Sequence, residues 1–436
     1  MELKLLHLSD IHFQHYGEHD YLDYDEDLRD QLENDLKGFV KKTGSINAIL
    51  ISGDIAFSSR EEEYSKASEW IEGICNICNC KEEHVLTVPG NHDINREIGA
   101  LILSAHDKFK AFNNRFQIDK ELFKYLTNDQ DYLFLLNPLK NYIAFAQKYS
   151  SLPIKNSLYW EKELLLDDIK VRVRGLNSTI ISNSTDDEKL SKLLLGGHQT
   201  VLKSEDGVIY LTMCHHPPQW LIDQEAVETD LHARAKIQLY GHKHLFELTK
   251  DDKTLKLTAG AVHPTRSEKE WDPRYNLIGL SIFTHKDIRS FKVRIWERIW
   301  NKVEMKFVPK IAESGNEFSE FILPIDSFQS IIGSKEMETV KTQVQDPASE
   351  DIELINLLLP DPKRKLAYLF FDLPYHLRIE IACKLGLVED SDENLSSIQK
   401  SQSYFNKATE LKKLDQLWDL IVPVNKDIQD IINPFK

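Results

Sequence analysis

Hydrophobic and polar residues follow two different rhythms along the first hundred residues. Short, largely apolar runs at 5–8, 48–51 and 85–88 predict buried β-strands. Between these runs, apolar residues recur every three or four positions, which predicts amphipathic helices over about 25–42 and 61–77. Strands and helices that alternate in this way are typical of an α/β domain with a largely parallel sheet.

The pattern becomes helical and rich in aromatic residues from about 94 to 151. We expect this insertion to be a helical cap that shapes access to a site. A buttress away from the site is an equal alternative, because aromatic stripes are more often core than binding surface. Apolar runs then predict further strands at 170–176, 208–214, 237–240, 255–259, 277–283 and 290–296.

Regular patterning fades after about residue 310, where polar and helix-breaking residues dominate. We expect a first domain over 1–310, a linker over 311–350 and an all-α bundle over 351–436. In the bundle, apolar residues recur at helical spacing from Leu366 to Ile381 and from Tyr404 to Ile421.

Five of the predicted strands end in side chains that bind metal ions. The carboxyl ends of neighbouring parallel strands meet at one edge of a sheet, where open α/β sheets bind ligands. One such motif is more often structural, but five in equivalent places indicate a shared site. The motifs are Asp10-Ile11-His12, Gly53-Asp54, Gly90-Asn91-His92-Asp93, His215-His216 and Gly241-His242-Lys243-His244.

These motifs supply carboxylate, amide and imidazole ligands, which suit divalent ions such as manganese, iron, zinc or nickel. Seven ligands suit two ions that share Asp54 as a bridging carboxylate, and manganese is our first expectation. Paired ions with a bridging hydroxide hydrolyse phosphoesters. His92 follows the ligand Asn91 directly, so it is better placed to donate to the leaving group. The seven expected ligands are Asp10, His12, Asp54, Asn91, His215, His242 and His244.

The ordered motifs resemble those of the calcineurin-like metallophosphoesterases over residues 1 to about 300. This resemblance implies an α/β sandwich of two mixed sheets flanked by helices. It also implies that His92 is catalytic and that Asp93 orients it. One ion would be held by Asp10, His12, Asp54 and His244, and the other by Asp54, Asn91, His215 and His242.

Two further assignments concern the adjacent histidines at 215–216 and an asparagine at 177. Strand alternation should turn only one of His215 and His216 inward. The family's ligand usually lies two places before the proline, which favours His215 and leaves His216 either to support a ligand or to contact the substrate. Asn177, at the end of a predicted strand, is a candidate substrate contact, although a turn asparagine is the commoner role.

Charge, aromatic residues and cysteines bear on what the protein can bind and where it is found. A net charge of −16 disfavours diffuse attraction to nucleic acid or anionic lipid without excluding a nuclease. A basic and aromatic stretch at 291–307 could stack single-stranded nucleic acid, although an ordinary strand pair with one buried face is favoured. The clustered Cys75, Cys78 and Cys80 are expected to be structural thiols rather than a zinc site. We expect a cytoplasmic protein without a membrane span.

The leading hypothesis is a phosphodiesterase that acts on nucleotides or nucleic acid. A phosphatase of phosphoproteins or small phosphomonoesters would use the same ions. The third hypothesis is a binding module with a silent metal site. The carboxy-terminal helices are similar to small effector-associated adaptor domains of bacterial conflict proteins, which implies that they recruit a protein partner.

Overall fold

The chain forms two compact units, Met1–Ile331 and Ile332–Lys436, which are considered separately. The computed structural model describes a defined set of residues in each unit. In the first unit these are 2–17, 23, 25–96, 98, 103–149, 151–154, 156–182, 193–264, 272–285 and 288–325. In the second they are 363, 366, 369–370, 373, 375–389, 392, 397–421 and 433–435.

The first sheet has the strand order β12-β11-β10-β1-β2-β3, with β13 also paired to β11. Strands β1, β2 and β3 are parallel, whereas β10 and β11 return antiparallel beside β1. Its strands are β1 (Glu2–Leu8), β2 (Ala48–Ile51), β3 (Val85–Thr87), β10 (Arg274–His285), β11 (Ile288–Asn301), β12 (Lys306–Pro309) and β13 (Ser319–Pro324).

The second sheet has the order β4-β5-β6-β7-β9-β8. Its central strands β5, β6, β7 and β9 are parallel, and an antiparallel strand closes each edge. Its strands are β4 (Tyr159–Leu166), β5 (Ile169–Leu176), β6 (Val208–Met213), β7 (Ala235–Tyr240), β8 (Glu247–Lys250) and β9 (Leu255–Thr258).

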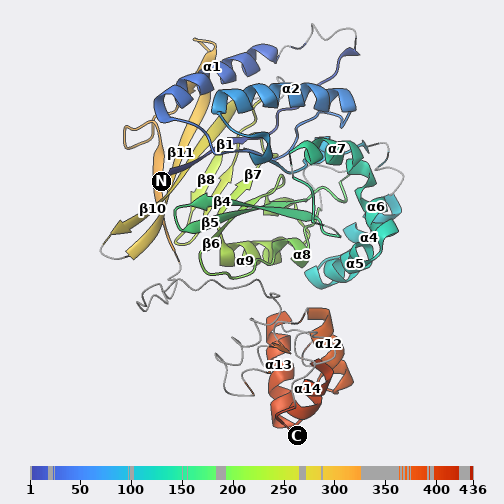
Figure 1. Ribbon diagram of the computed structural model, residues 1–436. Coiled ribbons are helices and arrows are strands. Elements are labelled where there is room, and N and C mark those ends of the chain that lie inside the picture. The colour runs from blue at the N-terminus through green and yellow to red at the C-terminus, as the bar shows by residue number, and fades with distance from the viewer. Residues whose placement is uncertain are drawn as a thin grey trace, which may run out of the picture. The chain divides into compact units, whose positions relative to one another are not determined.

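Apolar side chains from both sheets meet in a dry inner layer, which includes Leu5, Leu50, Val173 and Leu239. Helices α1 (Glu26–Thr43) and α2 (Glu61–Cys78) cover one outer face, and α8 (Gly197–Thr200) and α9 (Gln224–Arg234) lie on the other side (Figure 1). This arrangement confirms the expected two mixed sheets flanked by helices. Among the described helices, none combines the length and apolar character needed to cross a membrane.

The insertion folds into α4 (Leu103–Lys110), α5 (Arg115–Thr127), α6 (Asp129–Leu136) and α7 (Lys140–Lys148). Its buried aromatic residues belong to the same core as α1 and α2 on one side and α9 on the other. Phe145 stacks on Tyr64 of α2, and the Tyr142 hydroxyl lies 2.9 Å from that of Thr87. These contacts support the buttress, and the cap stays a prediction.

One feature of the first unit corrects a sequence prediction, and a second supports the ordinary strand pair that the sequence favoured at 291–307. The linker cannot begin at residue 311, because β13 pairs with β11 and buries Leu323 completely. The basic and aromatic stretch is not a stacking surface, because its rings are buried and its cations are paired, as Arg294 is with Glu320. The buried rings are Phe291, Trp296, Trp300 and Phe307.

The clustered cysteines behave as small core residues. Cys75, Cys78 and Cys80 are buried and carry no disulfide. Burial raises the pKa of Cys75 to about 11 and that of Cys80 to about 12. These thiols therefore stay protonated at neutral pH, which supports a structural role because metal ligation requires the thiolate.

The second unit contains α12 (Tyr375–Lys384), α13 (Ser397–Glu410) and α14 (Leu414–Ile421) around a core of its own. The helical spacing of apolar residues continues from 404 to 421 in the sequence, but the structure contains two helices there. Lys412 has a positive φ of 53° and Leu411 is 55% exposed, so a turn separates α13 from α14. Within these two helices most predicted positions are buried, as at Tyr404 and Trp418, and Leu414 is half-buried.

Candidate metal centre

The loops that follow β1 and β2 hydrogen-bond to each other beyond the ends of the strands. The Asp10 amide donates to the Gly53 carbonyl at 3.0 Å, and the His12 amide donates to the Asp54 carbonyl at 3.0 Å. The Val262 and His263 amides in turn donate to the carbonyls of Ser9 and Asp10. Backbone pairing therefore fixes the positions of the first two motifs relative to each other.

Most of the expected carboxylate and imidazole ligands lie on an unfavourable backbone. Asp10, His12, Asp54, His242 and His244 all have positive φ values, between 52° and 70°. Residues with a Cβ rarely adopt this region, and such conformations cluster at functional sites. Each of these residues lies in a loop that follows a strand, and the loops bring their side chains into the same space.

Two glycines allow the loops to approach this closely. A Cβ at Gly53, where φ is 99°, would lie 2.4 Å from Nδ1 of His215. A Cβ at Gly90 would lie 2.1 Å from Oδ1 and 2.5 Å from the backbone nitrogen of Asp54. The glycines of the Gly-Asp and Gly-Asn-His-Asp motifs are therefore required by the packing of one ligand loop against another.

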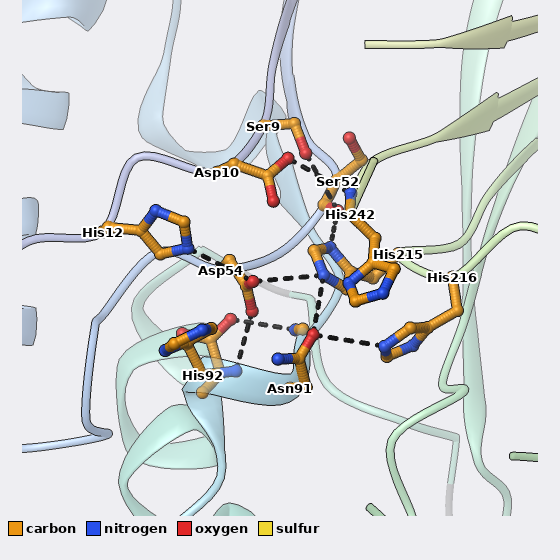
Figure 2. Close-up of polar contacts among 12 residues, drawn as sticks. Ser9, Asp10, His12, Ser52, Asp54, Asn91, His92, His215, His216 and His242 are labelled. Atoms are coloured by element: carbon orange, nitrogen blue, oxygen red, sulfur yellow. Dashed lines mark hydrogen bonds and ion pairs between the residues drawn. The ribbon is translucent and has the colours of Figure 1, made fainter. Parts of the chain in front are cut away.

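Asp54 lies at the centre of the site and is 1% exposed. Its Oδ2 is 3.3 Å from Nε2 of His12 on one side and 3.2 Å from Nε2 of His215 on the other (Figure 2). Its Oδ1 accepts a hydrogen bond from the His92 amide at 2.8 Å. Asp54 is thus the carboxylate that two groups of donor side chains share.

The first donor group contains Asp10, His12 and His244, whose ligand atoms lie within 4.8 Å of one another. Nε2 of His244 is 3.3 Å from Oδ1 of Asp10, and the rings of His12 and His244 are 5.5 Å apart. Together with Asp54, these residues offer two carboxylates and two imidazoles. That donor set suits a borderline divalent ion.

The second donor group contains Asn91, His215, His216 and His242. Nε2 of His215 and Nε2 of His216 both lie 3.2 Å from Oδ1 of Asn91 (Figure 2). His215, His216 and His242 can place one nitrogen each within 4.8 Å of the others. Three imidazoles and an amide oxygen beside Asp54 form a second candidate ion position.

The partners of the imidazoles select which nitrogen is free to bind an ion. Nδ1 of His215 donates to the Ser52 carbonyl at 2.8 Å, and Nδ1 of His12 donates to the His263 carbonyl at 3.4 Å. A carbonyl oxygen only accepts, so Nδ1 carries the proton of the neutral ring and Nε2 is the nitrogen that can bind an ion. Backbone carbonyls commonly orient metal-binding histidines in this way, and the residues therefore fit a divalent ion.

The amino-terminal unit matches the calcineurin-like phosphoesterase family over residues 3–246, more than half of the chain. The chain belongs to the calcineurin-like phosphoesterase family. Members of this family use divalent metal ions. Residues 362–422 match a second family, the GTPase-associated adaptor domain.

Among curated proteins, the phosphoesterase is similar to the uncharacterized metallophosphoesterase-like protein YydB of Bacillus subtilis. The two are 24% identical over 359 residues, which cover 78% of this chain and 68% of YydB.

Among solved structures, Vacuolar Protein Sorting 29 from Cryptosporidium parvum is 14% identical, with a TM-score of 0.31 and coverage of 73% of this chain and 98% of that one. A Staphylococcus aureus 5'-nucleotidase, described as putative, is 11% identical, with a TM-score of 0.33 and coverage of 83% and 58%.

Charges within the phosphoesterase site oppose the effect of burial at Asp54 and His215 and add to it at His242. Burial alone would raise the pKa of Asp54, but the charge of His215 and the hydrogen bond from His12 hold it well below its usual range. Burial likewise disfavours protonated His215, but the charge of Asp54 raises the pKa of its imidazole to about 9. Burial and then the charge of His215 lower the pKa of His242 to about 4. In the absence of an ion, a proton on His215 therefore balances the shared carboxylate.

We predict that metal affinity increases with pH. The raised pKa means that His215 is protonated below about pH 9, and an ion must displace this proton to reach Nε2. The apparent affinity for manganese should rise about tenfold per pH unit for each proton displaced. Calorimetric titration with manganese at pH 6, 7 and 8, in buffers of different ionisation enthalpy, measures both the affinity and the protons released. A pH-independent affinity without proton release would contradict this prediction.

The expectation that only one of His215 and His216 points inward is wrong. Strand β6 ends at Met213, so strand alternation no longer applies to the residues that follow. Both rings reach Asn91, but His215 also contacts Asp54, whereas Nδ1 of His216 lies 2.8 Å from the Ser178 hydroxyl. The contact with the shared carboxylate supports His215 as the ligand.

Alanine variants of these neighbouring histidines should give different metal contents. We expect His215→Ala to lose one of two bound ions. His216→Ala should keep both ions and lose about 10- to 100-fold in activity, as variants of groups that support ligands do. Metal analysis of the two proteins, purified side by side, makes each the control for the other. Full metal occupancy in His215→Ala would overturn the assignment.

Asp93 does not orient His92 through its own carboxylate, contrary to the expectation from the family. Asp93 accepts hydrogen bonds from the amides of Ile55, Ala56 and Gly90 at 2.9–3.2 Å, and from the Tyr64 hydroxyl at 2.9 Å. Nδ1 of His92 donates instead to the Phe57 carbonyl at 2.8 Å. Asp93 therefore fixes the loop that carries this carbonyl, and acts on His92 only through the loop.

Asn177 occupies a turn rather than the site. Its Oδ1 accepts from both the amide and the hydroxyl of Thr179 at 2.9 Å, and its backbone bonds to Gln199. Its neighbour Ser178 supports His216 instead. Sequence reasoning also missed Ser52 and His263, because both support their histidines through backbone carbonyls, which leave no signal in the side-chain sequence.

Proposed function

We propose that this protein hydrolyses phosphodiester bonds of nucleotides or nucleic acid with two divalent metal ions, of which manganese is the first candidate. The observation that supports this most directly is the position of Asp54. One oxygen of its carboxylate lies within 3.3 Å of a histidine from each donor group. A carboxylate placed between two donor sets suits a pair of ions better than a single ion.

The ligands are proposed to divide as in the family. Asp10, His12, Asp54 and His244 would hold one ion, and Asp54, Asn91, His215 and His242 the other. Divalent ions bound there would polarise the phosphate and acidify a water molecule. The carboxylates of Asp10 and Asp54 would neutralise only part of the charge of two divalent ions. The remaining positive charge suits the single negative charge of a phosphodiester. The same set can also bind a phosphomonoester, which is therefore the alternative to test.

His92 is proposed to serve the leaving group. Its Nδ1 is bonded to the Phe57 carbonyl, so Nε2 is the nitrogen available to a substrate. To donate a proton from Nε2, the ring must carry both protons, and burial lowers the pKa of His92. The proton can pass to the departing oxygen, where negative charge develops.

The carboxy-terminal unit is proposed to bind a protein partner. It has its own apolar core, which includes Leu369, Ala408 and Trp418, and it matches an adaptor-domain family. The name of that family makes a GTPase-containing protein the first partner to test. In this arrangement the phosphoesterase unit would be the effector, and a binding protein with a silent metal site is the opposing hypothesis.

The test is hydrolysis by the purified full chain in added manganese, with Asn91→Ala as the control. The panel contains single- and double-stranded DNA, RNA, cyclic nucleotides, a phosphopeptide and an aryl phosphodiester. Cleavage of a nucleotide diester that is lost in Asn91→Ala supports the proposal. Activity on the phosphopeptide alone would replace it with a phosphatase, and inactivity of the metal-loaded protein on every substrate would favour the binding module.

A further inference from the structure

Phe57 stands out at the edge of the metal centre because its apolar ring is 41% exposed. Its centroid lies 5.1 Å from that of His92, with 31° between the ring planes, and 6.1 Å from that of His12, which meets it edge-on. Single exposed apolar side chains are common on protein surfaces. The position of this one is informative, because it lies beside the histidine proposed to serve the leaving group.

The backbone of Phe57 is fixed on both sides. Its amide donates to the Phe13 carbonyl at 3.0 Å, and its carbonyl accepts the hydrogen bond from His92 at 2.8 Å. The amide of the preceding Ala56 donates to Asp93 at 3.0 Å. The ring is therefore presented by a backbone that is already ordered, and a ligand that stacks on it would lose little further chain entropy.

A second aromatic ring, Trp220, borders the other donor group but is less suited to stacking. Its ring meets that of His242 at 89°, with centroids 5.0 Å apart. The Lys243 ammonium lies 5.7 Å from the Trp220 centroid and is held by Glu247 at 2.8 Å. A cation thus already covers part of the indole. Phe57 is the better candidate for contact with a substrate.

We propose that Phe57 is a stacking platform for a nucleobase on the leaving-group side of the scissile phosphodiester. This rests on the proposed function and specifies its substrate class as nucleoside-bearing phosphodiesters. In the reaction, a water oxygen bonds to phosphorus, the bond from phosphorus to the leaving nucleoside oxygen breaks, and that oxygen takes a proton. The departing nucleoside must pass His92, and its base can then lie on the adjacent phenyl ring.

Every nucleobase has a π-face, so stacking on Phe57 would be tolerant of sequence. Removal of one base–aromatic stack typically lowers binding about 5- to 150-fold. If the stack involves only the leaving nucleoside, its loss should lower activity on a substrate that has a base there more than on a substrate that lacks one. It should not lower activity on all substrates equally.

The experiment compares three dinucleoside monophosphates in manganese: thymidylyl-thymidine, and its two analogues in which one nucleoside is replaced by an abasic tetrahydrofuran residue. The products identify which nucleoside leaves. Wild-type kcat/KM should be about 5- to 150-fold higher with a base on the leaving nucleoside than without it. This ratio should fall to near one in Phe57→Ala and be restored in Phe57→Trp. Phe116→Ala removes a ring that is 57% exposed on α5, and as the matched control it should keep the wild-type ratio.

Failure of the inference can be separated from failure of the proposed function. If wild type cleaves the base-bearing and abasic substrates equally well, or if Phe57→Ala keeps the wild-type ratio, the protein is a phosphodiesterase without a base platform at Phe57. If wild type hydrolyses a nucleoside monophosphate but none of the three diesters, the phosphodiesterase proposal is wrong, and the platform falls with it.

Discussion

Replacement of Asp54 by asparagine should lower kcat/KM at least about 10³-fold. Loss of a single electrostatic contact to a transition state costs about 10²- to 10³-fold, and Asp54 is shared by both donor groups. Asparagine has almost the same shape and can still accept the hydrogen bond from the His92 amide. The variant therefore removes the charge between His12 and His215 while it preserves the packing of the loops.

The measurement combines metal analysis with the rate of hydrolysis of an aryl phosphodiester in manganese. We expect Asp54→Asn to lose bound metal as well as activity, because both ion positions depend on this carboxylate. Asp168→Asn is the matched control, since Asp168 is exposed and pairs with Arg289 at 2.5 Å. Near-normal activity and metal content in Asp54→Asn would rule out a shared carboxylate at this position.

Replacement of His92 by glutamine should lower kcat by about 10²- to 10⁴-fold while the metal content stays unchanged. This result is expected if His92 transfers a proton and is not a ligand. Its ring lies within reach of His12 and Asp54, so the structure alone also permits a ligand role. Unchanged metal content with lost turnover separates these two roles.

The effect of this substitution should depend on pH. Burial lowers the pKa of His92, so its doubly protonated form is populated on the acidic side of the usual histidine range and lost as pH rises. The ratio of wild-type to variant kcat should therefore be largest in acid and decline as pH increases. His84→Gln, at the opposite end of β3 from the site, is the control. Loss of an ion in His92→Gln would identify His92 as a ligand instead.

The sequence was sufficient to predict the strands that carry the site, because each is a buried apolar run that stops at a polar motif. Helices α1 and α2 were placed to within one residue at each end, since their apolar residues keep a regular helical spacing. Strands β4, β8, β12 and β13 were missed. Three of these are only four to six residues long, and β4 is an edge strand in which only three of the eight positions are buried.

The finer arrangement of the site depends on backbone geometry that the side-chain pattern does not record. The sequence predicted that the expected ligands share one site. It could not show that both His215 and His216 reach Asn91, because that depends on where β6 ends. The resemblance to the family implied that Asp93 orients His92. The short turn at Asn91–Asp93 instead sends the two side chains to different partners.

The left-handed backbone at the ligands also has a consequence for stability. Asp10, His12, Asp54, His242 and His244 each adopt a conformation that glycine would adopt with less strain. Glycine at such a position would relieve strain in the backbone but would remove a carboxylate or an imidazole from the site. The five positions therefore set the stability of the fold against the ability of the site to hold ions.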